Sequence, residues 1–291
     1  MAKSTFDIYQ AVTDRIIQQL EKGSIPWRKP WRGIPAINYI SRKPYRGVNP
    51  LLLPFPGEYA TFKQIKEKGG HVKKGEKGHM IVFYKPIAII DKDTGEEKEI
   101  PYLRYSTVFH ISQAEGIETK TEPVNLNPDI APIQKASDIL NDYITRSGVK
   151  LCYIEGSDRA YYSPGEDQIA LPHIGQFSAN EDYASVAFHE AAHSTGHHTR
   201  LNRDLGTASF GSKTYSQEEL IAEISAAALM NIAGIELPET FENSAAYIQS
   251  WLARLQNDNK FIIKASSAAQ KATDYILNPG ADAAATEINE E

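Results

Sequence analysis

The order of apolar and polar positions predicts that the chain begins with an amphipathic helix and continues as a loop-rich segment. In residues 4–22 the apolar positions recur every fourth residue, so one stripe of the predicted helix packs into a core; the stripe is Ile8, Val12, Ile16 and Leu20. Ser4 or Thr5 stands where a cap begins such a helix, and Gly23 stands where it ends. Prolines interrupt residues 24–60, which predicts loops and short extended pieces.

Further along, the pattern changes to strands and then to helices. Residues 80–90 and 100–111 read as two strands of a hairpin around the turn 91–98, after a short helix at 61–68. Residues 112–132 are acidic and contain several prolines, which is typical of a linker. The remainder predicts the following elements: helices at 133–145, 184–193, 215–230, 243–258 and 260–277, and strands at 149–155 and 160–172.

We therefore predict an α+β protein of two domains, the usual number for 291 residues. The expected boundaries are a first domain at 1–115, a linker at 116–132, a second domain at 133–278 and a disordered tail at 279–291. The net charge of −6 is unevenly divided, because residues 1–90 carry about +10 and the rest about −16. A basic module that binds a polyanion, joined to an acidic module with a different task, accounts for this division.

The basic part alternates cations with aromatic rings, which suits single-stranded nucleic acid because rings stack on bases and cations hold phosphates. The candidate DNA-binding residues are Trp27, Arg28, Lys29, Trp31, Arg32, Tyr39, Arg42, Lys43, Tyr45, Arg46, Lys63, Lys73, Lys74 and Lys77, with Lys85 as a further phosphate contact. No recognition helix for duplex DNA is evident. The bland alternative is that the tryptophans fill a small core and the cations are merely solvated.

The sequence His189-Glu190-Ala-Ala-His193 carries the candidate chemistry of the second part. Residues four apart lie on one face of a helix, so both imidazoles could reach one metal ion, and Glu190 could act as the base on a metal-bound water. The five-residue pattern alone also occurs by chance. Its apolar flanks make chance a weaker explanation, because polar groups on a buried helix are costly without a partner.

A third protein ligand is needed, and the sequence leaves its identity open. Gly196 matches the metzincin pattern, but Thr199 stands where that pattern has its third histidine, and His197 and His198 are out of register. The other candidates are Glu219 and Glu223, one turn apart on the predicted helix 215–230. Ser216 and Glu219 fit a capping box, which would leave Glu223 as the ligand; a gluzincin-like reading, which we favour, makes Glu219 the ligand and Glu223 the partner of a histidine.

The composition and the first residues of the chain also predict the compartment in which the protein is found. Cys152 is the only cysteine, no apolar stretch approaches a membrane span, and the N-terminus lacks the apolar region of a secretory signal. We expect a cytoplasmic protein with no membrane partner.

Three groups of residues together resemble the ArdC-type antirestriction proteins of conjugative plasmids, whose N-terminal region is similar to that of TraC-type primases. The groups are VTDRIIQQLEKGSIPWRKPW with YRGVN, TFKQIKEKGGHVKKGEKG with VFHISQAEGI, and AFHEAAHSTGHHTRL with YSQEELIAEISAA and AAYIQSWL. The resemblance covers roughly residues 6–277.

The resemblance implies a single-stranded-DNA-binding domain followed by a zincin-like metallopeptidase domain, in a protein that protects incoming plasmid DNA from host restriction. It implies a divalent metal, Zn²⁺ first and Mn²⁺ as the alternative, held by His189, His193 and Glu219, with Glu190 as general base. Tyr215 is a candidate for stabilising an oxyanion, on its nearness in sequence alone. The expected partners are single-stranded DNA and a protein substrate or the host restriction machinery. The rival hypothesis is a DNA-binding decoy whose metal centre is structural and not catalytic.

Overall fold

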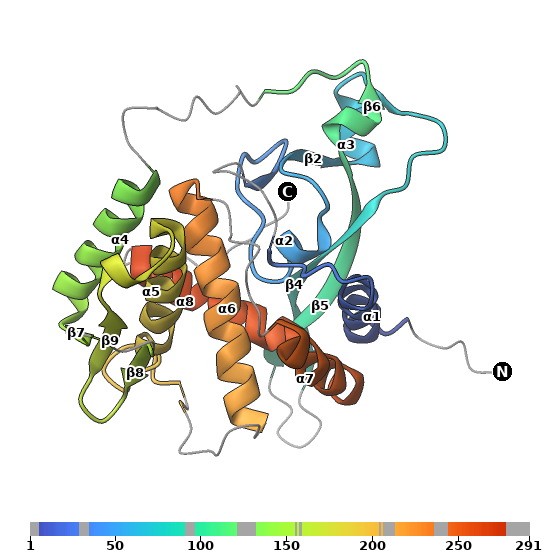
Figure 1. Ribbon diagram of the computed structural model, residues 1–291. Helices are drawn as coiled ribbons and strands as arrows, with labels where there is room; N and C mark the ends of the chain where they lie inside the picture. Colours follow the sequence, from blue (N-terminus) through green and yellow to red (C-terminus); the bar gives the residue numbers. More distant parts are fainter. Residues whose placement is uncertain are drawn as a thin grey trace.

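The computed structural model describes residues 6–28, 35–90, 97–120, 132–154, 156, 159–203, 205, 213–235 and 244–277. Helices and strands are both abundant, as an α+β fold requires, and Figure 1 shows a mainly helical part beside a part built around a long strand pair. Among these residues, no helix has the length and apolar content needed to cross a bilayer.

The N-terminal part is a four-stranded sheet with helices at its sides. Its strands are β1 (Ala36–Asn38), β2 (Gly57–Thr61), β4 (His79–Ile90) and β5 (Glu97–His110), arranged in the order β1-β2-β5-β4. The predicted hairpin is confirmed, since β4 and β5 pair antiparallel over their length. A second small sheet joins β3 (His71–Val72) to β6 (Ala114–Glu115) beside α3 (Phe62–Glu67).

Helix α1 (Ile8–Glu21) begins after Asp7, whose side chain accepts a hydrogen bond from the backbone N–H of Gln10. The cap is therefore Asp7, whereas Ser4 and Thr5, the predicted caps, lie outside the described residues. The predicted core role of the stripe is confirmed: Val12 and Ile16 are fully buried.

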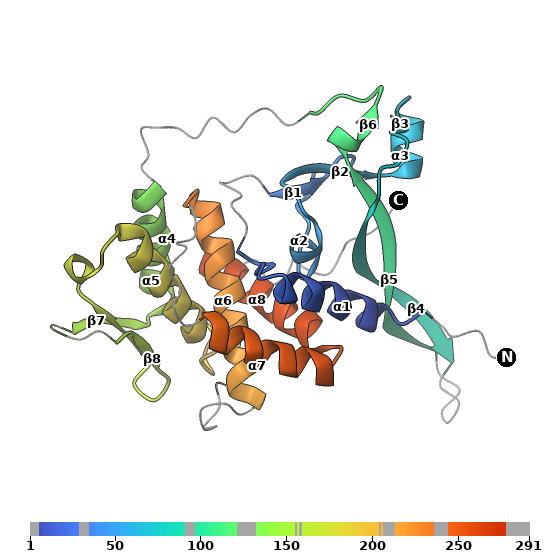
Figure 2. The same ribbon diagram turned by 45° about the vertical axis from the view of Figure 1, so that its right-hand side comes forward.

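The C-terminal part packs helices against a three-stranded sheet, as Figure 2 shows. The strands β7 (Lys150–Ile154), β9 (Gln168–Pro172) and β8 (Tyr161–Ser163) lie in that order. The helices are α4 (Pro132–Ser147), α5 (Asn180–Ser194), α6 (Lys213–Ala233), α7 (Ser244–Asn257) and α8 (Phe261–Leu277). The single strand predicted at 160–172 is two strands, β8 and β9, of which β9 is paired on both sides and β8 lies at an edge of the sheet.

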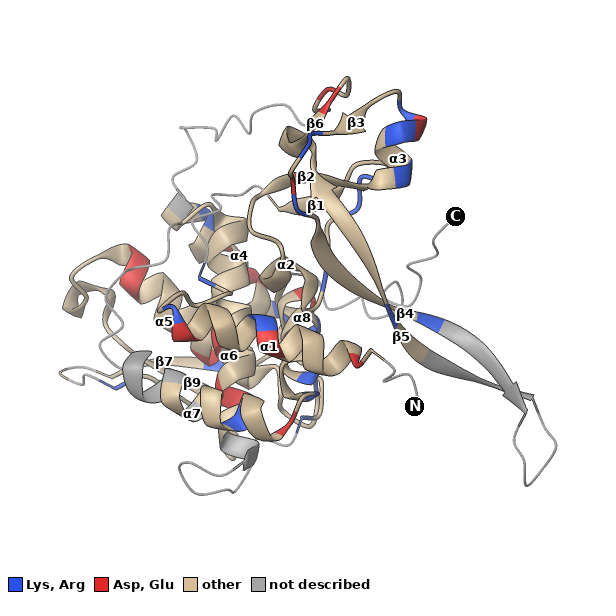
Figure 3. Ribbon diagram, turned by 90° about the vertical axis from the view of Figure 1, so that its right-hand side faces the viewer, with Lys and Arg blue, Asp and Glu red and all other residues tan. Residues whose placement is uncertain are grey.

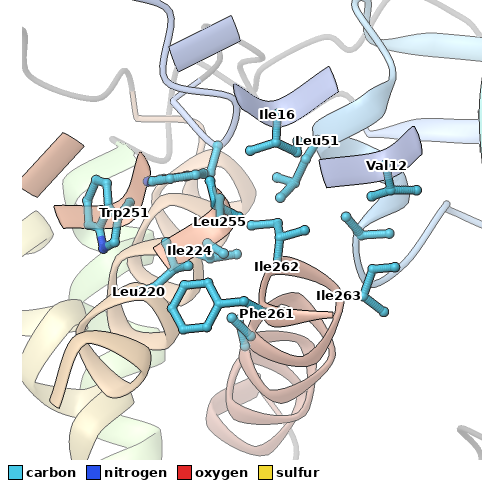
Figure 4. Close-up of a cluster of buried hydrophobic side chains, with 14 of the residues drawn as sticks. Val12, Ile16, Leu51, Leu220, Ile224, Trp251, Leu255, Phe261, Ile262 and Ile263 are labelled. Atoms are coloured by element: carbon cyan, nitrogen blue, oxygen red, sulfur yellow. The ribbon is translucent and has the colours of Figure 1, made fainter. Parts of the chain in front are cut away.

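One hydrophobic core joins the two parts of the chain. Side chains of α1, α2 (Asn49–Leu52), β4 and β5 pack with side chains of α6, α7 and α8, and Figure 4 shows Val12, Ile16 and Leu51 facing Phe261 and Ile262. Residues of the predicted linker also touch the N-terminal part: the Tyr39 hydroxyl donates to the Glu118 carbonyl, and Glu58 accepts from the Lys120 N–H. Because apolar surface is buried across this junction, the two parts are held as neighbours by the hydrophobic effect.

Candidate metal centre

Helix α5 presents both histidines of the motif on one face. It contains no glycine or proline, and Glu181 and Asp182 lie in its first turn, where negative charge stabilises a helix. The Nε2 atoms of His189 and His193 are 3.1 Å apart. Glu190 lies between them in sequence and is 8% exposed. The spacing of the motif therefore brings one nitrogen of each imidazole close together, beside a buried carboxylate.

Helix α6 packs against α5 and brings Glu219 to the pair. Its Oε2 lies 3.6 Å from His189 Nε2, and its Oε1 lies 3.7 Å from His193 Nε2. One donor atom from each of the three side chains falls within 4.8 Å of the other two. Ser216 lies inside α6, which begins at Lys213, so the capping-box reading of Glu219 is wrong.

The second nitrogen of each imidazole faces its own carboxylate. His193 Nδ1 lies 3.3 Å from Glu218 Oε1, and His189 Nδ1 lies 4.0 Å from Glu223 Oε1. A carboxylate at Nδ1 favours the tautomer that keeps its proton there, which leaves the Nε2 lone pair directed toward the centre. Two histidines and a carboxylate on the inside, with carboxylates behind the histidines, fit the ligand chemistry of a divalent metal.

Glu218 is a residue that sequence reasoning missed. Arg203, in the loop after α5, donates to both of its oxygens, at 3.1 Å from Nε and 2.7 Å from Nη2. Arg203 also donates to the Ala192 carbonyl and the Thr195 hydroxyl, so it ties the end of α5 to α6. The only signal in the sequence was an acidic residue next to Glu219, and nothing in the helical spacing distinguished it.

Gly196 permits the close return of this loop. A Cβ atom at this position would lie 2.3 Å from Leu205 Cδ2 and 3.1 Å from Arg203 Nη2, so a larger residue would displace Leu205 and crowd the arginine. The metzincin reading does not describe the site, since His197 Nδ1 lies 2.8 Å from the Thr199 hydroxyl and 3.9 Å from Asp167 Oδ2. Among the described residues, the cluster suited to a metal contains neither His197 nor His198.

The charges of the site act strongly on the histidines. Burial disfavours the charged form of His189, but the contact with Glu219 and the charges of Glu190 and Glu223 outweigh burial and raise its pKa to about 9. Burial likewise raises the pKa of Glu218, but His193 and Arg203 outweigh it and bring the pKa below its ordinary value. Glu218 is therefore ionised at neutral pH and able to accept hydrogen bonds from both partners.

Arg28 comes to this centre from the basic N-terminal segment. Its Nη2 lies 3.4 Å from Glu223 Oε2, and the two side chains are 15% and 12% exposed. The neighbouring Trp27 is 6% exposed, and its ring meets that of Trp251 edge-on at 5.0 Å. The stacking role expected of Trp27 is wrong for this conformation, because its faces are covered by the core.

Several other predicted DNA-binding residues also have internal partners. Tyr39 is 5% exposed, and Tyr45 packs against Tyr59. Arg42 pairs with Glu58, and Arg46 pairs with Asp274. Neighbouring carboxylates and the core thus occupy groups that the alternating pattern had assigned to bases and phosphates. Arg42 stays exposed although it is paired, and the predicted lysines that are described and exposed are Lys43, Lys63, Lys73, Lys74, Lys77 and Lys85.

Four predicted site residues lie partly or wholly outside the residues that the structure describes. Lys29, Trp31 and Arg32 fall in a gap of the described chain, and Tyr215 is placed in α6 without its side chain. Their roles remain predictions.

Comparison with known proteins links both parts of the chain to the same proteins. Residues 6–109 match the N-terminal domain of the anti-restriction factor ArdC, and residues 139–268 match a zincin-like metallopeptidase family. The crystal structure of the antirestriction ArdC protein from the R388 plasmid, in metal-free form, is 37% identical with a TM-score of 0.73, covering 93% of this chain and 97% of that one. Its Mn(II)-bound structure is 36% identical with a TM-score of 0.76, covering 95% and 99%.

Relatives known from sequence show the same extent of similarity. A DNA primase TraC of Escherichia coli is 34% identical over 95% of this chain, and an uncharacterised protein, y4eC, of Sinorhizobium fredii (strain NBRC 101917 / NGR234) is 31% identical over 97% of it. The chain spans 28% of that primase and 20% of a second TraC, but 95% of y4eC. Since the similarity to the solved ArdC structures runs through both parts, the chain belongs to the ArdC family of antirestriction proteins.

Proposed function

We propose that this protein binds single-stranded DNA and protects incoming plasmid DNA from host restriction during conjugation, and that its C-terminal part is a metal-dependent peptidase. The observation that carries the peptidase half is the convergence of His189, His193 and Glu219 beside the buried Glu190. Family membership supports the antirestriction half, and the basic N-terminal charge supports DNA binding.

The proposed ligands are His189, His193 and Glu219, with Zn²⁺ as the first candidate and Mn²⁺ as the alternative. Two imidazoles and a carboxylate make the ligand set of catalytic zinc sites that keep one position open. Mn²⁺ is supported by the similar R388 protein, which binds Mn(II). When bound, the metal would supply Lewis acidity at that open position and lower the pKa of a water toward about 7.

The chain's own residues prepare the site for hydrolysis of a peptide bond. Glu190 is the proposed general base, because its carboxylate is buried within the same turns of α5 as the two histidines. Glu223 and Glu218 hold the imidazole rings from behind. Tyr215 remains the proposed stabiliser of the oxyanion. The substrate we propose is a protein that the chain meets with DNA or in the host restriction machinery, in the cytoplasm.

DNA binding is proposed to use the exposed lysines of the N-terminal part. Lys63 and Lys73 lie on and after α3, and Lys74 and Lys77 follow in the loop that leads to β4. Each is exposed, so a phosphate could approach without breaking the core. Neutralising phosphates releases counterions, and the affinity should therefore fall as salt is added.

The test combines elemental analysis with a Glu190→Gln variant, which keeps the size of the side chain and removes its basicity. Wild type is expected to carry one equivalent of divalent metal and to protect transferred DNA in a restriction assay. The variant is expected to keep the metal and lose protection, together with any metal-dependent cleavage of a partner protein.

Each part of the proposal has its own refuting result. Full protection by the metal-loaded variant would show that protection does not need catalysis, and would favour the rival hypothesis of a DNA-binding decoy whose metal is structural. Absence of bound metal after incubation with Zn²⁺ or Mn²⁺ would exclude the metal centre. Failure of wild type to bind a single-stranded oligonucleotide at low salt would exclude the DNA-binding half.

A further inference from the structure

On one face of the β4–β5 ribbon, Ile81 is buried near the sheet, but the described side chains from Phe83 outward are left largely uncovered by the rest of the described molecule. The register pairs Phe83 with Arg104 and Lys85 with Tyr102. Residues directly opposite each other in an antiparallel pair share a face, and so do residues two apart on one strand. These four residues therefore form one patch, with the rings of Phe83 and Tyr102 on one diagonal and the cations Lys85 and Arg104 on the other. Figure 3 shows β4 and β5 running side by side away from the helical part.

The side chains on the other face of the same ribbon contact the rest of the molecule. Val82 and Leu103 are buried in the core that joins the two parts of the chain. The Tyr84 hydroxyl lies 3.5 Å from the hydroxyl of Tyr9 on α1. The ring of Tyr105 lies 5.0 Å from the ring of Phe6. Aromatic residues on this face thus serve contact with the N-terminal helix and the segment before it.

On the uncovered face the same residue types are exposed to solvent. Tyr102 is 51% exposed, Lys85 and Arg104 are exposed, and Phe83 is half-buried. Within the described part of the chain, none of the four makes a side-chain hydrogen bond, ion pair or ring contact. They differ in this from Trp27, whose ring the core covers.

We propose that Phe83, Lys85, Tyr102 and Arg104 form a stacking platform for single-stranded DNA, an inference that rests on the proposed DNA binding and names its site. Unpaired bases expose their faces and can stack on Phe83 and Tyr102, whereas a duplex hides those faces. Lys85 and Arg104 stand two residues along their strands from these rings, about 6.8 Å away, where they can neutralise the flanking phosphates. Stacking does not depend on which base is present, so the platform tolerates any sequence, as entry of a whole plasmid strand requires.

The test compares two tyrosines of the same strand in the full-length protein. Tyr102→Ala removes a ring from the platform, and Tyr105→Ala removes an equally exposed ring, 49% against 51%, from the opposite face. The probes are a fluorescent oligothymidylate and an abasic oligonucleotide of the same length, titrated at low salt. We expect Tyr102→Ala to weaken oligothymidylate binding about 5- to 150-fold, the range for one stacked base, and to leave the abasic probe within about twofold.

Further variants separate stacking from folding and from charge. Tyr102→Phe should restore oligothymidylate binding, since the ring remains. Lys85→Met should weaken both probes alike and reduce the slope of log affinity against log salt by about 0.7. Thermal unfolding identifies any variant that has lost its fold.

The outcomes distinguish this site from the general function. If wild type binds oligothymidylate but Tyr102→Ala and Tyr105→Ala weaken it equally or not at all, the platform is wrong and DNA binding stands. If wild type binds no oligonucleotide, the proposed DNA binding and the platform both fail. Equal weakening of both probes by folded Tyr102→Ala would also overturn base stacking.

Discussion

Replacement of Glu218 by glutamine tests whether the carboxylate behind His193 organises the metal centre. The change keeps the shape of the side chain and removes the charge that faces His193 Nδ1 at 3.3 Å and accepts two hydrogen bonds from Arg203. Without that charge the His193 tautomer with its proton on Nδ1 is less favoured, so the lone pair at Nε2 is less available to a metal.

The expected magnitude follows from these contacts. Loss of a partner behind a ligand histidine costs about 10- to 100-fold in metal affinity, or about 1.4–2.8 kcal/mol. The free energy of unfolding of the metal-free protein should also fall, by about 3 kcal/mol, because Arg203 loses its carboxylate in a site where the two side chains are 12% and 8% exposed. Arg203 retains its bonds to the Ala192 carbonyl and the Thr195 hydroxyl, which argues for this lower end of the usual range.

Affinity is measured by titrating metal-free protein with Zn²⁺ and with Mn²⁺ against a competing chelator, and stability by urea unfolding with excess chelator. Glu181→Gln is the matched control, since it removes one negative charge from an exposed position in the first turn of α5. A folded Glu218→Gln variant that binds both metals within threefold of the control would refute the organising role of Glu218.

The remaining predictions concern interdomain coupling, pH and the fold. Arg28→Met and Glu223→Gln should be non-additive by about 0.5–3 kcal/mol in a double-mutant cycle of urea unfolding, because the two side chains are paired; additivity within 0.3 kcal/mol would contradict the pair. Zn²⁺ affinity should rise about tenfold per pH unit between pH 7 and 9, because the pKa of His189 is raised to about 9 in the metal-free protein and the metal must displace that proton. Calorimetry in buffers of different ionisation enthalpy should show the release of this proton. An affinity that does not change with pH in this range would contradict the prediction. Asp167→Asn should destabilise the protein by about 3–5 kcal/mol at pH 7, as the side chain of Arg200 is 1% exposed and loses its carboxylate. Burial raises the pKa of Asp167, but Arg200 outweighs burial and lowers the pKa in the folded protein. The stabilisation is therefore present above about pH 3.9 and is lost as the pH falls through the lowered pKa of the folded state. A loss of stability in Asp167→Asn as large at pH 2 as at pH 7 would contradict the ion pair.

Local sequence patterns determined the elements that depend on neighbours along the chain. Periodicity predicted helix α1 and its buried stripe, and the two apolar runs around a polar turn predicted the β4–β5 hairpin. The spacing of His189 and His193 was enough to place both imidazoles on one face of a helix, because that geometry is a property of the helix itself. Motif resemblance added the family, which the comparisons bear out.

The alternation of rings and cations in residues 24–46 was a weaker guide. It could not distinguish a tryptophan that stacks on a base from one that fills a core, since both are rings beside charged residues. Burial decided the matter for Trp27 and Tyr39, and ion pairing decided it for Arg42 and Arg46. That the half-buried ring of Phe83 and the exposed ring of Tyr102 share a face follows only from the register of the hairpin.

The sequence by itself determined two histidines on a helix, a nearby helix with acidic residues, and a basic half joined to an acidic one. Only the tertiary structure decided which acidic residue faces which nitrogen: Glu219 toward both Nε2 atoms, Glu218 behind His193 and Glu223 behind His189. The crossing of α5 and α6 sets those partners, and such a crossing is fixed by long-range packing that no local pattern records. The same is true of Arg28, which reaches Glu223 across 195 positions of sequence because a shared hydrophobic core brings the two parts of the chain together.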